Sequence, residues 1–98
     1  MILPLLRVIN ASKEKLVVVC DSELLGKTFR KKHLRLEVKE NFYRGKEASV
    51  RECLEAIRSA TIANLVGSIV NEAIEAGMIE EGCVISFRGA PHAQLVRM

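Results

Sequence analysis

The chain has 98 residues, of which 49% are hydrophobic and 28% are charged, and its formal net charge is +3 at pH 7. This length predicts a single domain, residues 1–98, because domains commonly hold roughly 100 to 150 residues, and the balance of apolar and charged residues excludes a disordered chain. The longest charge-free runs fall far short of the roughly 20 apolar residues that cross a bilayer, so we expect a cytoplasmic protein with no membrane partner.

Three cysteines, Cys20, Cys53 and Cys83, lie far apart and form no CxxC pair. An odd number without paired spacing excludes a disulfide framework and a zinc knuckle. Each cysteine falls within an apolar segment, where a free cysteine packs as a small hydrophobic residue. We therefore expect buried structural cysteines, no metal site and no cofactor. The alternative is a metal site completed by His33 and His92.

Charge is distributed unevenly along the chain. Residues 27–46 hold eight basic and two acidic side chains, a balance of +6, whereas residues 47–81 hold two basic and seven acidic ones, a balance of −5. Clustered charge of one sign attracts a partner of the other sign, although a solvated surface has the same composition. The residues that we predict to bind nucleic acid are Lys27, Arg30, Lys31, Lys32, Arg35 and Lys39.

The first half of the chain carries strand patterns. The segments "LPLLRVI" and "KLVVVCD" predict two strands, and "NASKE" between them suits a tight turn, so we expect a hairpin. Pro4 has no amide to give to a ladder and belongs at the start of its strand or on a sheet edge. The segment "DSELLG" predicts one helical turn that ends at Gly26. The alternation in "HLRLEVKENFY" predicts a strand with one wet, largely basic face.

The second half predicts two helices followed by strands. Ser49 and Glu52 have the spacing of a capping box, and an apolar stripe follows them at once. A second stripe, residues 62–73, is out of phase with the first, so we expect a break near "RSAT" and a second helix that Gly77 ends. The segments "GCVISFRG" and "AQLVRM" predict two final strands.

These elements predict an α+β fold, a two-layer sandwich in which a mostly antiparallel sheet of four to five strands packs against two helices. The first strand carries Ile2, Leu3, Leu5 and Leu6, which point to both faces and need a cover on each side. A helix end, a terminus or a second chain provides such a cover. A homodimer is therefore one predicted assembly.

The segment "VVVCDSELLGKT" imitates the end of a phosphate-binding loop at Gly26, Lys27 and Thr28. The complete motif needs a glycine five residues before Gly26, where this chain has Asp21. A carboxylate at that place repels the phosphates that backbone amides would otherwise bind. We therefore do not expect nucleotide hydrolysis.

His92 suits general base or ligand chemistry best, because imidazole titrates near neutral pH. Neither Ser68 nor Ser86 lies in a nucleophile motif such as GxSxG, and no acid in the C-terminal segment orients the imidazole. The sequence therefore assigns no catalytic residue and favours a binding protein over an enzyme. We expect His92 to bond a backbone carbonyl in the turn of residues 89–91, with a binding role as the alternative. The ligand-binding candidates are Asn64, Arg88, His92 and Gln94.

The segments "CDSELLGKTF", "SATIANLVG" and "PHAQLVRM" together resemble an archaeal family of small proteins known as domain of unknown function 424. The resemblance covers nearly the whole chain. It implies a compact two-layer α/β domain in an archaeal cytoplasm. It supplies no established substrate, cofactor or catalytic set that can be transferred to residues of this chain.

Three hypotheses for the function remain. The first is a non-enzymatic module that binds RNA or a ribonucleoprotein through residues 27–46, with Phe29, Phe42 and Tyr43 stacking on unpaired bases. The alternative for Phe29 and Phe42 is a place in the core. The second hypothesis is a small-ligand or enzymatic site around His92, and the third is a protein–protein interaction subunit. A continuous basic face favours the first, and an exposed His92 bonded to a carboxylate favours the second.

Overall fold

The computed structural model describes residues 3–97, so Ile2 of the predicted first strand lies outside the described residues. Within this range the chain forms eight strands and three helices, together with two short 3-10 turns. The strands are β1 (Pro4–Ala11), β2 (Glu14–Asp21), β3 (Thr28–Lys31), β4 (Leu34–Glu37), β5 (Lys46–Glu47), β6 (Ile62–Val66), β7 (Val84–Phe87) and β8 (Ala90–Val96). The helices are α1 (Glu40–Tyr43), α2 (Val50–Arg58) and α3 (Ser68–Glu75), and the turns are η1 (Ser22–Leu24) and η2 (Glu81–Cys83).

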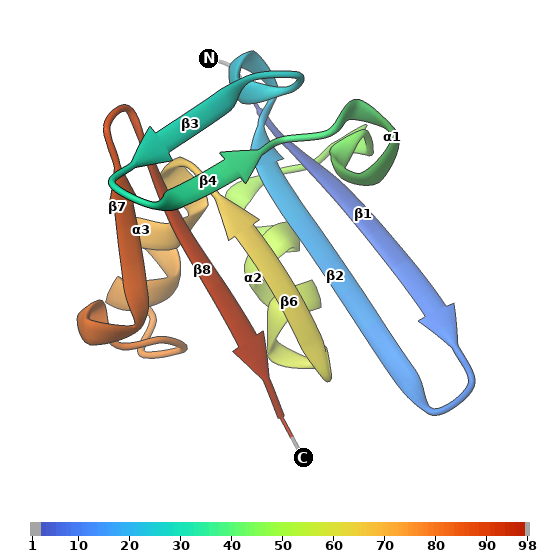
Figure 1. The fold of residues 1–98 in the computed structure, drawn as a ribbon. Helices are drawn as coiled ribbons and strands as arrows, with labels where there is room; N and C mark the ends of the chain where they lie inside the picture. Colours follow the sequence, from blue (N-terminus) through green and yellow to red (C-terminus); the bar gives the residue numbers. More distant parts are fainter. Residues whose placement is uncertain (1–2, 98) are drawn as a thin grey trace.

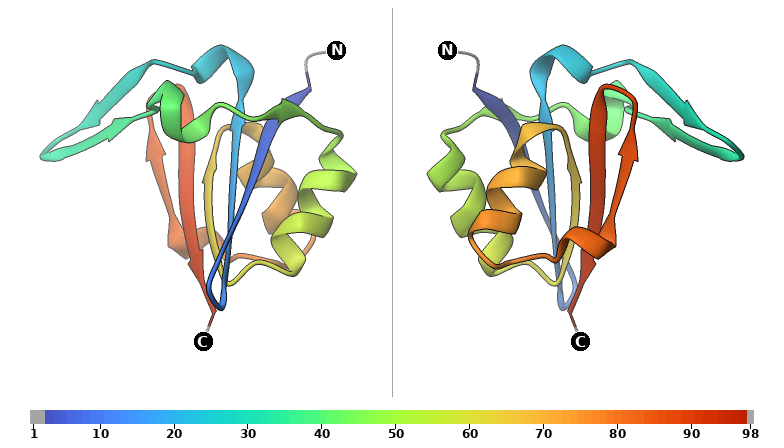
Figure 2. Two further views of the ribbon diagram at one scale, coloured as in Figure 1. Left: turned by 90° about the vertical axis from the view of Figure 1, so that its right-hand side faces the viewer. Right: turned by 90° about the vertical axis from the view of Figure 1, so that its left-hand side faces the viewer.

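Between residues 3 and 97, six strands form a mixed sheet in the order β5-β1-β2-β6-β8-β7 (Figure 1). β2 and β6 run parallel, and the other neighbouring strands run antiparallel. The helices α2 and α3 cover one face of the sheet, whereas β3 and β4, a separate two-stranded sheet, lie on the other side (Figure 2). The predicted α+β class is confirmed. The prediction of a two-layer sandwich with four to five strands is wrong, because the main sheet has six strands and a second small sheet is present.

Residues 62–66, predicted to begin the second helix, form strand β6 instead. β6 lies beside the valine-rich β2, with Leu16 to Cys20 of β2 in register with Ile62 to Val66. β6 is therefore a central strand, buried on both faces at Leu65 and Val66, and its apolar residues do not alternate cleanly with polar ones. A short run of this kind has no period that separates a strand from a helix. The change of phase seen in the sequence near "RSAT" marks the end of α2 and the start of β6, whereas the change from β6 to α3 falls inside the second stripe.

The protein buries apolar side chains on both faces of the main sheet. On the helix side, Val17, Val19 and Leu65 pack with residues of α2 and α3, including Ile57 and Ile69. On the opposite side, a second cluster joins strand residues to residues of β4, α1 and the segments beside them: Leu5, Val18, Cys20, Leu24, Leu36, Val38, Tyr43, Val66, Phe87 and Ala90. The two faces of β1 are covered accordingly, Leu5 by the second cluster and Leu6 by the first. The cover predicted for the first strand thus comes from the same chain.

Several predicted local signals are confirmed. β1 and β2 form a hairpin, Pro4 starts β1, and Gly77 follows α3 with a φ of 74°. The predicted capping box is present, with Ser49 Oγ accepting from Glu52 N at 3.1 Å and Glu52 Oε1 accepting from Ser49 N at 3.0 Å. The hydrogen bond that Ser49 N donates to the Glu52 carboxyl, followed by the effect of the Ser49 side chain, holds the pKa of that carboxyl below its ordinary value. Local pattern and local structure therefore agree at the ends of these elements.

Two arginines that sequence analysis did not single out tie the layers together. Arg97 Nη1 donates to the carbonyls of Ile57 and Ala60, at 2.8 Å each, and so caps the C-terminal end of α2. Arg7 Nη1 donates to the carbonyl of Asn41 at 2.7 Å, which fixes α1 against β1. Cationic side chains stabilise such helix ends because they satisfy free carbonyls.

Within residues 3–97, no helix is long and apolar enough to cross a membrane.

Candidate nucleic-acid interface

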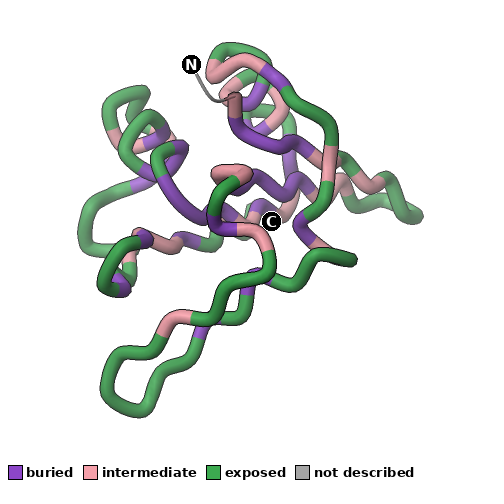
Figure 3. The backbone as a smooth tube through the Cα atoms, turned by 90° about the horizontal axis from the view of Figure 1, so that it is seen from above, coloured by how far each residue is buried: buried purple, intermediate pink, exposed green. Residues whose placement is uncertain are grey.

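The strands β3 and β4 form a hairpin, residues 28–37, that we call the arm. Its two strands pair antiparallel from Thr28 opposite Glu37 to Lys31 opposite Leu34, with Lys32 and His33 in the turn. The arm leaves the sheet on the side away from α2 and α3 and projects from the body of the protein (Figure 2). Figure 3 shows that most of its length is exposed. The sequence predicted the wet, basic face of this segment but not its projection.

The two faces of the arm differ in chemistry, because side chains alternate along each strand. Phe29 and Leu36 are opposite each other on the inner face and pack on the second cluster. Arg30 and Arg35 are directly opposite each other on the outer face. Like charges in this position destabilise a strand pair. The pairing of Arg30 with Arg35 therefore does not help the arm to fold.

The six predicted nucleic-acid-binding residues are all exposed. They lie on the arm or at its base: Lys27, Arg30, Lys31, Lys32, Arg35 and Lys39. Arg35 forms an ion pair with Glu37 at 3.3 Å, and the other five have no carboxylate within ion-pair distance among the described residues. Exposed cationic groups without internal partners remain available to an anion.

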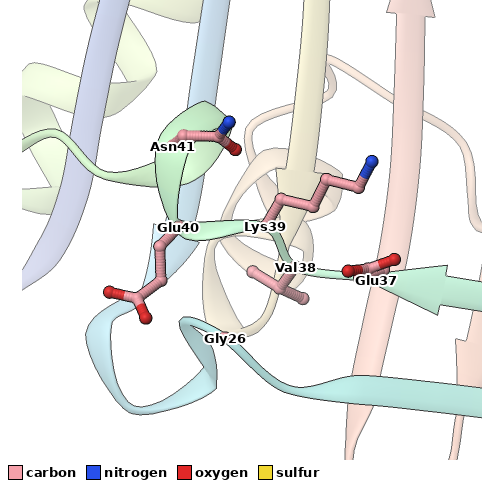
Figure 4. A pocket seen from close by; sticks show the side chains of 6 residues that line it. All are labelled: Gly26, Glu37, Val38, Lys39, Glu40 and Asn41. Atoms are coloured by element: carbon pink, nitrogen blue, oxygen red, sulfur yellow. The ribbon is translucent and has the colours of Figure 1, made fainter.

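A depression of about 450 Å³ lies at the base of the arm (Figure 4). Its lining combines one cation with two carboxylates: Gly26, Glu37, Val38, Lys39, Glu40 and Asn41. The side chains of Lys39 and Glu40 leave the backbone in opposite directions (Figure 4). Backbone hydrogen bonds close the base of the arm, from Gly26 N to Val38 O at 2.7 Å and from Val38 N to Lys27 O at 2.9 Å. Because Glu37 and Glu40 repel anions, this depression is a poorer phosphate site than the arm itself.

Asp21, which stands where the phosphate-binding motif needs a glycine, has a structural role in this fold. Its carboxylate accepts hydrogen bonds from Ser68 N at 2.8 Å and Ser68 Oγ at 2.7 Å. It therefore lies at the N-terminal end of α3, where the helix dipole favours an anion. Gly67, which precedes the helix, has a φ of 102°, and a Cβ there would lie 2.4 Å from Asp21 Oδ2. A carboxylate of the protein thus takes the place that a phosphate takes in nucleotide-binding loops.

The four predicted ligand-binding residues lie in two places. Asn64 and Gln94 are register partners on β6 and β8, and Gln94 Nε2 donates to Asn64 Oδ1 at 2.8 Å. His92 lies two residues from Gln94 on the same face of β8. Arg88 lies apart from these, in the turn between β7 and β8. The next residue of that turn, Gly89, lies against the ring of Phe29, since a Cβ there would be 3.7 Å from Phe29 Cε1.

His92 is half-buried and bonds the backbone, but its partner is not in the predicted turn. Its Nδ1 lies 3.0 Å from the carbonyl oxygen of Leu65 on the neighbouring strand. Because a carbonyl only accepts, Nδ1 carries the proton and Nε2 holds the lone pair of the neutral ring. Burial lowers the pKa of His92 below its ordinary value of 6.5, and the hydrogen bond to Leu65 opposes this change. A bond to a carbonyl rather than a carboxylate does not support a catalytic histidine.

The lowered pKa of His92 predicts a pH dependence of stability. The unfolded chain binds a proton at His92 more readily than the folded protein, so the free energy of unfolding should fall as the pH drops below 6.5. Above that pH the histidine is neutral in both states and contributes no slope. Urea unfolding at a series of pH values should show this fall in the unmodified protein and not in His92→Gln. Parallel curves for the two proteins would contradict the assignment.

The cysteines differ from one another in exposure. Cys20 and Cys53 are buried as predicted, and burial raises the pKa of each thiol to about 11. The prediction for Cys83 is wrong, because it is exposed at the end of η2 rather than packed beneath β7. Among the described residues, no three histidine, cysteine or acidic side chains gather as metal ligands do.

The aromatic residues beside the basic segment pack against the interior of the protein. Tyr43 is buried, so it is not available to stack on a base. Phe42 and Phe29 are partly buried and pack on the second cluster, and the Phe42 ring meets Tyr43 edge-on with a centroid distance of 5.1 Å. The alternative that placed Phe29 and Phe42 in the core therefore describes their packing.

The fold and the arm together define the class of this protein, which is a small α+β domain with a mixed sheet and a projecting basic arm. The chain belongs to the family described as "Protein of unknown function (DUF424)", whose model matches residues 9–98, and the resemblance seen in the sequence is confirmed. A solved structure of an uncharacterized conserved protein from Methanopyrus kandleri has a TM-score of 0.76 and 24% identity, over 97% of this chain and 93% of that one. At this identity the likeness shows the fold alone. Curated proteins gave no match.

Proposed function

We propose that this protein is a non-enzymatic binding module that holds RNA, free or within a ribonucleoprotein, through its basic arm. The observation that carries the proposal is the pair formed by Arg30 and Arg35 on the outer face of the arm. Two guanidinium groups placed opposite each other repel, and Glu37 offsets only Arg35, so the outer face keeps a net positive charge that favours a bound anion. Arginine is suited to that anion being a phosphate, because its planar fork donates two parallel hydrogen bonds.

The charge around this pair supports an extended polyanion rather than a single small anion. Lys27, Lys31, Lys32 and Lys39 continue the positive charge along the arm and its base. A polyanion such as RNA gains affinity from each phosphate that a cation neutralises, since condensed counterions are released. A module of this kind acts where RNA is present, which agrees with the expected cytoplasmic location.

The other predicted functions have weaker support. His92 bonds the backbone, and Asn64 and Gln94 bond each other. None of the three lines the depression at the base of the arm. None lines a second depression either, which is formed by Asn71, Ile74, Glu81, Val84, Ser86 and Pro91. The homodimer remains a prediction. The apolar residues of β1 that suggested it, Leu5 and Leu6, are covered within one chain.

The salt dependence of RNA binding tests the proposal. Each phosphate contact should contribute roughly 0.7 to the slope of log affinity against log salt for a single strand. We expect the fourfold variant Arg30→Gln, Lys31→Gln, Lys32→Gln and Arg35→Gln to flatten this slope by about 2 to 3. Its thermal midpoint should stay nearly unchanged, because exposed charges contribute little to stability. Fluorescence anisotropy with a short mixed-sequence RNA measures the slope, and differential scanning calorimetry measures the midpoint.

A matched control removes positive charge away from the arm. Lys13, in the β1–β2 turn, and Arg51, on α2, are both exposed. The variant Lys13→Gln with Arg51→Gln should keep the slope of the unmodified protein. Equal flattening by the two variants would show that net charge, not the arm, determines binding, and absence of binding at low ionic strength would end the proposal.

A further inference from the structure

The face of the main sheet that carries the arm is only partly covered. The second cluster fills the half nearest the base of the arm, where Val66, Phe87 and Ala90 are buried. Further along, the same face holds Asn64, two residues from Val66 on β6, and Gln94, four residues from Ala90 on β8, of which Gln94 is exposed. Because side chains of one strand face alternate with a period of two, Ile85 and Val96 share this face. We call this region, residues 64, 85, 94 and 96, the open half of the sheet.

Three of the four exposed large apolar side chains among the described residues lie on this side of the molecule: Leu34 at 48%, Ile85 at 37% and Val96 at 66%. The fourth, Val8 at 40%, lies on the helix side of β1. Leu34 shares the inner face of the arm with Leu36, so it points toward the side on which the open half lies. Ile85 and Val96 are thus exposed apolar groups on the same sheet face as the amides of the open half.

The amides of the open half retain most of their hydrogen-bonding capacity. The bond from Gln94 Nε2 to Asn64 Oδ1 uses one donor and one acceptor lone pair. Gln94 keeps its Oε1 and one N–H, and Asn64 keeps both N–H groups. An adjacent donor and acceptor match the Watson–Crick edge of an unpaired base, because that edge carries both in every base. In an RNA duplex these edges are paired or lie in a groove too narrow for side chains.

The position of the arm joins these features into one surface. The arm leaves the sheet at an angle, so its inner face and the open half look onto the same region of solvent (Figure 2). Lys31, on the inner face, and Lys32, in the turn, bring positive charge to the edge of that region. A strand of RNA that passes from Arg30 and Arg35 on the outer face around the edge of the arm at Lys31 and Lys32 would bring its following bases onto the amides and apolar side chains.

We propose that the protein binds single-stranded RNA, with the phosphates on the arm and the unpaired bases against Asn64, Gln94 and the apolar residues of the open half. The proposal rests on the function proposed above and adds the class of RNA and the surface that contacts its bases. Unstacked bases need both an apolar surface for their faces and polar groups for their edges. The positive charge of the arm favours RNA, which is a polyanion, over a second copy of this chain as the occupant of the surface.

Two comparisons test the inference. The first measures affinity for a mixed-sequence single strand and for the same sequence as a duplex, and we expect tighter binding of the single strand. The second uses Asn64→Ala with Gln94→Ala, which should lower affinity for the single strand about tenfold, the effect of losing one good base contact. Its salt slope should remain that of the unmodified protein, because the phosphate contacts are intact. Urea unfolding verifies that the variant is folded, and Asn71→Ala on α3 is the matched amide control.

The outcomes separate this inference from the proposed function. Equal affinity for single strand and duplex, with no loss in the double variant, would overturn the role of the sheet and leave binding by the arm intact. Absence of any RNA binding would overturn both. Sedimentation measurements test whether a second copy of this chain occupies the surface instead of RNA. A dimer that dissociates in Ile85→Ala or in the double variant, with unchanged RNA affinity, would assign the surface to a second copy and contradict the proposal.

Discussion

Replacement of Gly67 with alanine should destabilise the protein by about 3 to 5 kcal/mol, because two costs coincide. Gly67 has a φ of 102° and a ψ of −152°, a conformation that is essentially restricted to glycine. An added Cβ would also lie 2.4 Å from Asp21 Oδ2 and must displace that carboxylate. Displacement breaks the hydrogen bonds that Ser68 donates to Asp21, which cap α3. Urea denaturation followed by circular dichroism gives the change in the free energy of unfolding.

Gly77 provides the matched control for this substitution. It also has a positive φ, 74°, but no atom lies within 4 Å of the position of an added Cβ. Gly77→Ala should therefore cost only the backbone strain, about 1 kcal/mol. Equal losses for the two variants would mean that the contact between Gly67 and Asp21 adds nothing to stability, which would contradict the account of the β6–α3 junction.

The largest functional effect is expected from charge reversal on the outer face of the arm. Arg30→Glu with Arg35→Glu removes two phosphate contacts and places two carboxylates where phosphates bind. At salt near 50 mM, each contact contributes roughly tenfold to affinity, so the double variant should bind RNA about 100-fold more weakly. Stability should change little, because both side chains are exposed. Anisotropy titration and thermal unfolding measure the two quantities.

The control for this reversal changes the net charge by the same amount elsewhere. Lys13→Glu with Arg51→Glu leaves the arm intact and alters exposed residues of the β1–β2 turn and α2. Its affinity should stay close to that of the unmodified protein at moderate salt, where distant charges are screened. A loss of similar size in the control would place the RNA somewhere other than on the arm.

Local signals in the sequence predicted the local structure well. The capping box at Ser49, the start of β1 at Pro4 and the turn glycines depend only on neighbouring residues, and each is present. The error at residues 62–66 has a different origin. A central strand acquires its identity from β2 and β8, which lie on either side of it, and a pairing with segments far away in the chain leaves no period in the sequence.

The candidate site was predictable in composition but not in arrangement. The basic residues 27–39 were evident as a cluster, whereas the opposition of Arg30 and Arg35 depends on the two-residue turn at Lys32 and His33. That turn contains neither glycine nor asparagine, the residues from which two-residue hairpin turns are predicted. Asn64 and Gln94 were grouped correctly, since β6 and β8 place them opposite each other. Arg88, which the sequence grouped with them, lies outside this strand pair in the β7–β8 turn, beside Gly89, where an added Cβ would be 3.7 Å from Phe29 Cε1.

Mapping of RNA contacts by NMR tests the central claim most directly. A protein of 98 residues gives a resolved amide spectrum, and a short single-stranded RNA added at low salt reports each amide whose surroundings change. Binding by the arm and the open half predicts changes in residues 28–37 and along β6 and β8, with α2 and α3 unaffected. Changes confined to α2 and α3, or no change with RNA in excess, would contradict the claim.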